Sequence, residues 1–139
     1  MKTLTLTTKI KIRFSDIDAV RIVWHGVYAQ YFEDARELFG EKYGISYTGM
    51  EQEGFYAPLV ELKFNYRQPL RYGMEPELII TYIPTEAAKI LFDYQIRDSK
   101  TKEILASGHS VQVFVDLDYN LVCINPPFYE KWKDKWLNE

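Results

Sequence analysis

Apolar and polar residues alternate over several stretches of the chain, and a period of two predicts β-strands. In residues 4–14 the apolar side chains fall on even-numbered positions and polar ones on odd-numbered positions. This pattern is typical of a strand with one buried face. Further strands are predicted at residues 60–66, 77–83, 90–96 and 105–115, with a short return strand at 121–124. Successive strands joined by short connections indicate a meander, so the sheet should be mainly antiparallel.

Between the first two predicted strands the period changes to that of a helix. Apolar side chains recur at spacings of four, three, four and four at Tyr28, Phe32, Ala35, Phe39 and Tyr43. This predicts an amphipathic helix from about Gly26 to Tyr43 with a broad aromatic stripe. Gly44 follows as a left-handed C-cap would. A short C-terminal helix is predicted to begin at Asn125-Pro126, with Asn125 as its N-cap.

The predicted order is strand, long helix, four strands, short helix. No internal repeat and no Pro- or Ser-rich linker divides the chain, so residues 1–139 are expected to form a single domain. The expected fold is α+β, a long helix wrapped by a mainly antiparallel sheet of five to six strands.

Composition excludes several classes of protein. The chain has 139 residues, 47% of them hydrophobic, and a net charge of −3. Mild acidity argues against a nucleic-acid binder, which needs a basic face. The longest charge-free run, residues 104–115, is too short for a membrane-spanning helix, which needs about 18 residues. With no signal peptide recognisable at the start, we expect a soluble, cytoplasmic protein without a membrane span.

Cysteine and histidine are too few for several kinds of site. The single cysteine, Cys123, excludes an intrachain disulfide and a Cys-rich zinc site. It lies in an apolar run, which predicts an inert, buried thiol. The only histidines are His25 and His109, so a three-histidine metal site is excluded. His109 is in line with apolar positions and is expected to be a hydrogen-bonded core residue.

The candidate chemistry lies just before the long helix. Asp16 and Asp18 precede an apolar patch, and His25 stands at the threshold of the helix. The first turn of a helix presents unpaired N–H groups and the positive end of its dipole. A thioester or ester carbonyl directed there would be polarised, while a nearby carboxylate could attack the acyl carbon or activate water. An aspartate before a helix is also often only a cap.

The same residues carry a family resemblance. The run Asp16-Ile17-Asp18-Ala19, then Val23-Trp24-His25, Tyr28 and Tyr31-Phe32-Glu33-Asp34-Ala35-Arg36, resembles the motif of 4-hydroxybenzoyl-CoA thioesterase-like proteins. These are hotdog-fold acyl-CoA thioesterases, in which an antiparallel sheet wraps a long helix. The similarity extends over nearly the whole chain, although only the N-terminal motif is specific.

The resemblance implies a role for each matching residue. It makes Asp18 the catalytic carboxylate, acting as nucleophile or general base, and His25 a residue that orients water or the thioester. The helix start at His25 and Gly26 would bind the carbonyl oxygen, and Trp24 and Tyr28 would lie near the acyl pocket. Lys89 would meet the phosphates of coenzyme A. No metal or cofactor is implied beyond coenzyme A as part of the substrate, and homodimers or homotetramers with sites between subunits are expected.

The sequence also departs from the family pattern. Val20-Arg21 stand where a Gly usually follows Asp-Ala, so the loop is expected to run differently, because β-branched residues resist positive φ. Val27 replaces an Asn before the helix tyrosine. Among the other polar residues, Asp16 is expected to be structural. Glu33, Asp34 and Arg36 are expected on a solvated helix face, although the pattern Glu-x-x-Arg also fits a subunit interface.

Three other functions stay open from the sequence. An acyl-carrier-protein thioesterase would use a basic surface, rather than a nucleotide pocket, to hold its substrate. A non-catalytic acyl-ligand-binding module is favoured by Val20-Arg21 and disfavoured by the retained Asp18 and His25. A hotdog dehydratase expects a different motif around its histidine and ranks last.

Overall fold

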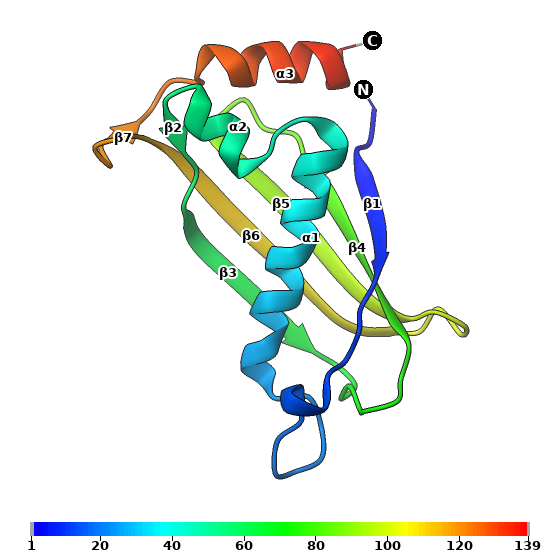
Figure 1. Ribbon diagram of the computed structural model, residues 1–139. Helices are drawn as coiled ribbons and strands as arrows, with labels where there is room; N and C mark the ends of the chain where they lie inside the picture. Colours follow the sequence, from blue (N-terminus) through cyan, green and yellow to red (C-terminus); the bar gives the residue numbers. More distant parts are fainter. Residues whose placement is uncertain (1, 139) are drawn as a thin grey trace.

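A long helix crosses one face of an antiparallel sheet in the computed structural model, which describes residues 2–138 (Figure 1). The predicted α+β class, with a long central helix and a mainly antiparallel sheet, is confirmed. The seven strands are β1 (Thr5–Lys9), β2 (Phe55–Tyr56), β3 (Leu59–Tyr66), β4 (Pro76–Ile83), β5 (Lys89–Asp98), β6 (Ile104–Asp116) and β7 (Leu121–Val122). The helices are α1 (Tyr28–Tyr43), α2 (Tyr47–Gln52) and α3 (Pro127–Leu137), with 3-10 turns η1 (Phe14–Asp16) and η2 (His25–Val27).

The strands follow the order β1-β4-β5-β6 across the sheet, and β3 and β2 lie beyond β6. All pairings are antiparallel. β6 is the longest strand, with 13 residues, and it bonds to β5 on one side and to β3 on the other. β1 and β3 therefore end the sheet, and β3 leaves an open edge.

The aromatic stripe of α1 forms the centre of the core. Phe32, Ala35 and Phe39 have no exposed surface. The Phe32 ring stacks on Tyr94 of β5, with ring centroids 4.0 Å apart. Gly44 ends the helix with φ of 74°, as predicted for a left-handed cap.

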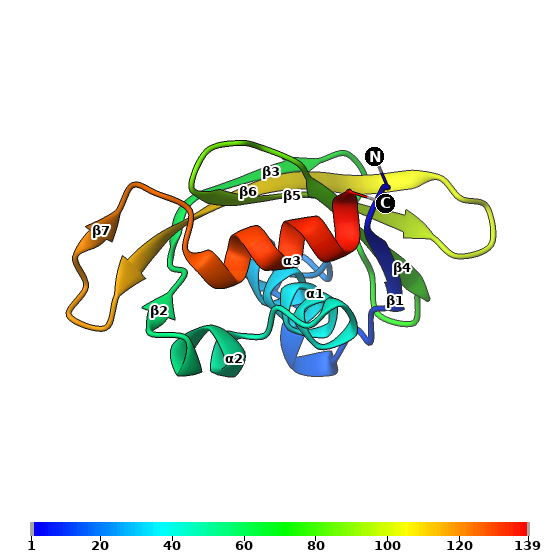
Figure 2. The same cartoon turned by 90° about the horizontal axis from the view of Figure 1, so that it is seen from above.

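The C-terminal helix α3 packs across the end of α1 (Figure 2). Its Trp132 Nε1–H donates to the carbonyl of Tyr43, at 2.7 Å, in the last turn of α1. The prediction that Asn125 caps this helix is wrong. Pro126 is the N-cap, and the Asn125 side chain instead donates to the carbonyl of Glu86.

The first strand is shorter than its sequence pattern. Pairing with β4 ends at Lys9, although the Ile10 N–H still donates to the carbonyl of Pro76. The chain then turns through η1, so Phe14 does not point inward and is 77% exposed. The segment after Gly44, where no helix was predicted, contains α2, which begins with Ser46 accepting from the N–H of Gly49.

Three polar or reactive residues lie in surroundings other than those predicted. Cys123 is exposed rather than buried. His109 is hydrogen-bonded, but to Asp93 on the sheet face away from α1, with 31% of its side chain exposed. Arg36 is only 4% exposed and is therefore not on a solvated face. Its neighbours Glu33 and Asp34 are exposed, as expected.

Candidate active site

Residues 17–23 form a tight hairpin just before the helix. An isolated bridge joins Ile17 to Val23, and the Asp18 N–H donates to the carbonyl of Ile22. One oxygen of Asp18, Oδ1, accepts from the N–H of Val20 at 2.8 Å. Oδ2 has no hydrogen-bond partner among residues 2–138. Asp18 is therefore a half-buried carboxylate with one oxygen oriented and the other available.

The tip of this hairpin turns at Arg21, whose φ is 67°. This is the left-handed conformation that glycine adopts most easily. Arg21, and not the β-branched Val20, takes the positive φ, so the loop turns here without a glycine. Val20 extends into solvent with 73% of its surface exposed.

Asp16 fastens the hairpin to the helix, as a structural residue would. Its Oδ2 accepts from the Tyr31 hydroxyl at 2.8 Å and from the Arg13 N–H at 3.0 Å. Its backbone carbonyl accepts from the Trp24 N–H at 2.9 Å. Burial and the Asp16 carboxylate raise the pKa of Tyr31 well above its ordinary value, so this hydroxyl stays protonated and donates.

The turn η2 presents free backbone donors ahead of α1. Within residues 2–138, no acceptor is bonded to the N–H of His25 or of Gly26. The indole of Trp24 lies over Gly26, where an added Cβ would come within 2.4 Å of the ring. Glycine is therefore required at this position as long as the indole stays in place.

Aromatic side chains surround this helix start. The rings of Trp24 and His25 are 5.2 Å apart, and both residues are exposed, Trp24 by 51%. The Tyr66 hydroxyl, from the end of β3, donates to the His25 carbonyl at 3.0 Å. Tyr28 is buried, its ring edge-on to Tyr66 at 4.8 Å. Burial raises the pKa of Tyr28, partly offset by a hydrogen bond from the Leu70 backbone.

The structure gathers most of the predicted residues but leaves one apart. Asp18, Trp24, His25, Gly26 and Tyr28 lie in or beside η2. Lys89 is at the other end of the sheet. Tyr66 pairs with Ala106, which pairs with Ile96, and Lys89 precedes Ile96 by seven residues. At about 3.3 Å per residue this places Lys89 about 23 Å along β5 from the site.

Sequence reasoning did not assign Tyr31 or Tyr66 to the site. Tyr66 reaches it only because β3 ends beside η2, and Tyr31 only because the hairpin folds back onto α1. The strand alternation that includes Tyr66 was visible, but nothing in it indicated a contact with His25. Among residues 2–138 no group of three His, Cys, Asp or Glu side chains is placed to hold a metal ion.

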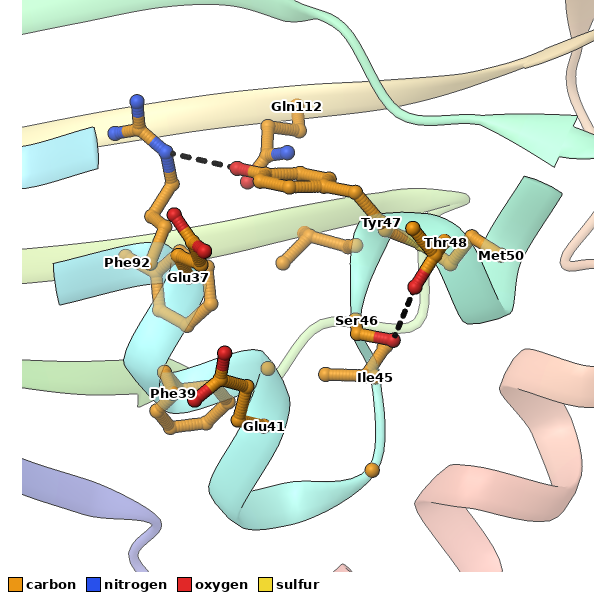
Figure 3. Close-up of a pocket in the computed structure, with 14 residues that line it drawn as sticks. Glu37, Phe39, Glu41, Ile45, Ser46, Tyr47, Thr48, Met50, Phe92 and Gln112 are labelled. Carbon is orange, nitrogen blue, oxygen red and sulfur yellow. Dashed lines mark hydrogen bonds between the residues drawn. The ribbon is translucent and has the colours of Figure 1, made fainter. Parts of the chain in front are cut away.

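A separate cavity of about 530 Å³ lies between α1, α2 and the sheet (Figure 3). Its walls include Phe39, Met50 and Phe92, with Glu37 and Glu41 also on its lining. The buried Arg36 borders it and donates through Nε to the Tyr47 hydroxyl and through Nη1 to that of Tyr94. This cavity is more than two helical turns from η2 and is not part of the candidate active site.

The architecture and the site together define a class of protein. A long helix held against one antiparallel sheet, with a carboxylate hairpin beside its first turn, is the arrangement expected of hotdog-fold acyl thioesterases. A family model described as the thioesterase-like superfamily matches residues 12–132. The chain belongs to the thioesterase-like superfamily, which confirms the predicted family.

Individual relatives agree with this membership. The chain is 30% identical over 89 residues to the Bacillus subtilis protein YneP, provisionally named as an acyl-CoA thioesterase, with 63% of this chain and 64% of YneP covered. It is 28% identical over 116 residues to an acyl-acyl carrier protein thioesterase of Arabidopsis thaliana, with 84% of this chain and 61% of that protein covered. The chain thus spans just under two-thirds of the length of each of these two relatives.

Solved structures show the same fold. A 1,4-dihydroxy-2-naphthoyl-CoA thioesterase from Synechocystis superimposes with a TM-score of 0.82 at 19% identity, covering 97% of this chain and 98% of that one. At that identity the likeness shows the hotdog fold alone. Among the described residues, 2–138, no helix is long and apolar enough to cross a membrane.

Proposed function

We propose that this chain hydrolyses acyl thioesters of coenzyme A or of an acyl carrier protein. The observation that carries the proposal is that two kinds of group beside the helix start lack hydrogen-bond partners. Asp18 has a carboxylate oxygen without a partner, and the N–H groups of His25 and Gly26 lack acceptors within residues 2–138. Membership of the thioesterase-like superfamily supports the reaction class.

The thioester carbonyl would direct its oxygen at the start of η2. There the N–H groups of His25 and Gly26, with the positive end of the α1 dipole, would stabilise the negative charge that develops on this oxygen. Trp24 and Tyr66 would flank the acyl group, since both are half-exposed beside the donors. Because these donors are backbone groups of a fixed turn, they need little reorganisation during the reaction.

The Asp18 carboxylate would supply the second half of the chemistry. As a general base it takes a proton from water while the oxygen of that water bonds to the acyl carbon. As a nucleophile it forms a mixed anhydride that water then cleaves. In both routes the carbon–sulfur bond breaks and the thiol leaves with a proton. The exposed His25 ring, next to its own backbone donor, would orient the water or the thioester.

A second subunit would complete the site. β3 leaves one edge unpaired, and Leu59, Val60 and Tyr66 are exposed along it. An open, apolar edge strand favours pairing with another strand. We propose a homodimer formed through β3, which would place a partner beside Tyr66 and His25. A homotetramer would use the sheet face away from α1, where Leu91 pairs with Val111.

Lys89 would act on the distant end of the substrate. Its position about 23 Å from the helix start along the strand prevents contact with the thioester itself. The pantetheine arm separates the phosphates of coenzyme A from the thioester, so Lys89 would meet a phosphate only if the arm extends along the sheet or if another subunit brings its Lys89 to the site.

The test is thiol release from acyl-CoA, acyl-carrier-protein and acyl-pantetheine thioesters with short, long and aromatic acyl groups. We expect Asp18→Asn to lower kcat by at least about a hundredfold, which is the usual contribution of a positioned acid or base. The matched control is Asp34→Asn, an exposed carboxylate on α1. Equal activity of the Asp18 variant and the wild type would refute the site, and stable binding of acyl ligands without turnover would favour the non-catalytic binding module.

A further inference from the structure

Two loops build the end of the molecule where the candidate active site lies. Residues 10–27 and 66–76 meet there, at the end remote from α3 (Figure 1). The Val23 N–H donates to the Leu70 carbonyl at 2.8 Å. The rings of Phe14 and Tyr72 meet edge-on at 5.8 Å. Side chains from both loops therefore share one surface.

This surface exposes large apolar side chains that a sheet or helix would normally bury. Phe14, Val20 and Tyr72 are 77%, 73% and 62% exposed. Trp24 and Tyr66, from the same two loops, are also half-exposed, and both rings lie beside that of His25 at the helix start. Grouped exposed apolar side chains on a folded protein mark a binding surface. Tyr, Trp and Phe are also the residues enriched at the centres of protein–protein interfaces.

The same two loops are basic, although the chain as a whole is acidic. They carry five basic side chains against three acidic ones, in a protein of net charge −3. Four of the six arginines of the chain are here: Arg13, Arg21, Arg67 and Arg71. All four are exposed. One of the acidic groups, Asp16, is occupied by Tyr31 and a backbone N–H.

We propose that this surface docks an acidic carrier protein that delivers the acyl group on a phosphopantetheine arm. We name it the arginine–aromatic rim and define it by Phe14, Val20, Arg21, Arg67, Arg71 and Tyr72. The proposal rests on the proposed thioester hydrolysis, since the rim adjoins Trp24 and His25 at the helix start. An acyl group on a flexible arm would enter there while its carrier rests on the rim.

Charge and shape favour a protein over a free nucleotide as the occupant. Arginines interleaved with exposed aromatic rings suit an extended acidic surface, whereas nucleotide recognition uses a few polar groups converging in a cleft. A second copy of this chain would pair at the open edge of β3, so the rim is not needed for that contact. The positive rim would also speed encounters with an acidic partner, an effect that salt weakens.

The test compares one acyl group on three carriers: an acidic acyl carrier protein, coenzyme A, and pantetheine, which has neither phosphate nor nucleotide. The variant is the double substitution Arg67→Glu and Arg71→Glu, because neither side chain has a hydrogen bond or ion pair within residues 2–138 and both lie outside the Asp18 hairpin. The matched control is Lys131→Glu with Lys135→Glu on α3. The readout is kcat/KM for the carrier protein divided by kcat/KM for pantetheine.

We expect the rim variant to lower this ratio by about tenfold or more, mainly through KM, and to flatten its salt dependence. The control should leave the ratio unchanged. Equal ratios in variant and wild type would overturn the proposal. An equal loss with coenzyme A would overturn it as well, because the arginines would then bind phosphates. A change in oligomeric state would identify a second copy of the chain as the occupant and equally overturn it.

Binding separates failure of this inference from failure of the proposed function. If the wild type hydrolyses no thioester, including acyl-pantetheine, the proposed hydrolysis is wrong. Fluorescence anisotropy of a labelled carrier protein then still measures docking, with the same variant and control. We expect binding by the wild type and the control and about tenfold weaker binding by the rim variant; equal binding by all three, or none by the wild type, would overturn the docking surface.

Discussion

Replacing Arg21 with glycine should stabilise the protein. The backbone at Arg21 has φ of 67°, and a left-handed conformation costs an L-residue with a Cβ about 1–2 kcal/mol. Glycine avoids this cost but adds freedom to the unfolded chain, which opposes folding by about 0.5–1 kcal/mol. The Arg21 side chain is exposed and has no hydrogen bond or ion pair within residues 2–138, so its removal loses little. The net expectation is a gain of about 0.5–1 kcal/mol in the free energy of unfolding.

Urea denaturation followed by circular dichroism measures this gain as a higher midpoint with an unchanged m value. At this chain length about 1 kcal/mol corresponds to an increase in Tm of about 2–4 °C. Val20→Gly is the matched control, because Val20 lies next to Arg21 in the same turn but has no positive φ. It should destabilise the protein by about 0.5–1 kcal/mol through the unfolded state.

Lys102 provides an internal comparison. Its φ is 64°, close to that of Arg21, but its ammonium group lies 2.9 Å from Glu77. Lys102→Gly should therefore gain less than Arg21→Gly, since it removes an ion pair along with the strain. The reasoning is refuted if Arg21→Gly is no more stable than the wild type while Val20→Gly is not destabilised.

Three further outcomes are expected. Tyr31→Phe removes the hydroxyl that donates to Asp16 and should lower kcat more than it raises KM, because the hairpin that carries Asp18 loses a hydrogen bond to a charged acceptor worth about 1.5–3 kcal/mol; unchanged steady-state kinetics would contradict this. Gly26→Ala should displace the Trp24 indole and lower kcat/KM, and an unaltered crystal position of the ring would show the packing argument to be wrong. The two cations bonded to Glu77 hold its pKa below the ordinary 4.5, so its contribution to stability is complete above that pH and is lost as pH falls towards the lowered value. Glu77→Gln should therefore reduce the acid-side fall in Tm measured by calorimetry, and an identical pH profile would argue against the effect.

Local periodicity predicted those helices and strands in which the spacing of apolar residues matches the side chains that are buried. The spacing of apolar residues from Tyr28 to Tyr43 gave α1, and Gly44 marked its end. The same reasoning failed at Phe14, because alternation continues past Lys9 whereas pairing with β4 does not. Strand pairing depends on a distant segment, which a local period does not contain.

The local pattern of apolar and polar residues also did not predict which polar side chains are buried. Arg36 was expected in solvent because it was grouped with Glu33 and Asp34 on one polar helix face, but α2, which was not predicted, packs against it. The helix brings its Tyr47 over the guanidinium, and Tyr94 of β5 supplies the other partner. His109 was assigned to the core from its apolar neighbours, although the sheet face it occupies is the one that α1 does not cover.

The candidate site was predictable where its residues are close in sequence. Asp18, Trp24, His25 and Gly26 lie within nine positions of one another, so the segment that carries the family motif spans them all. Tyr66 joins them through the register of β3, which no motif records. The distance of Lys89 from η2 could not be predicted for the same reason, since it is set by the sheet.

The half-exposed indole of Trp24 gives the protein an optical reporter at the mouth of the site. Its ring lies 5.2 Å from that of His25, beside the backbone donors of η2. The other two tryptophans, Trp132 and Trp136, are on α3 at the far end of α1. With both replaced by phenylalanine, the remaining fluorescence would report the arrival of an acyl group at the helix start without any label.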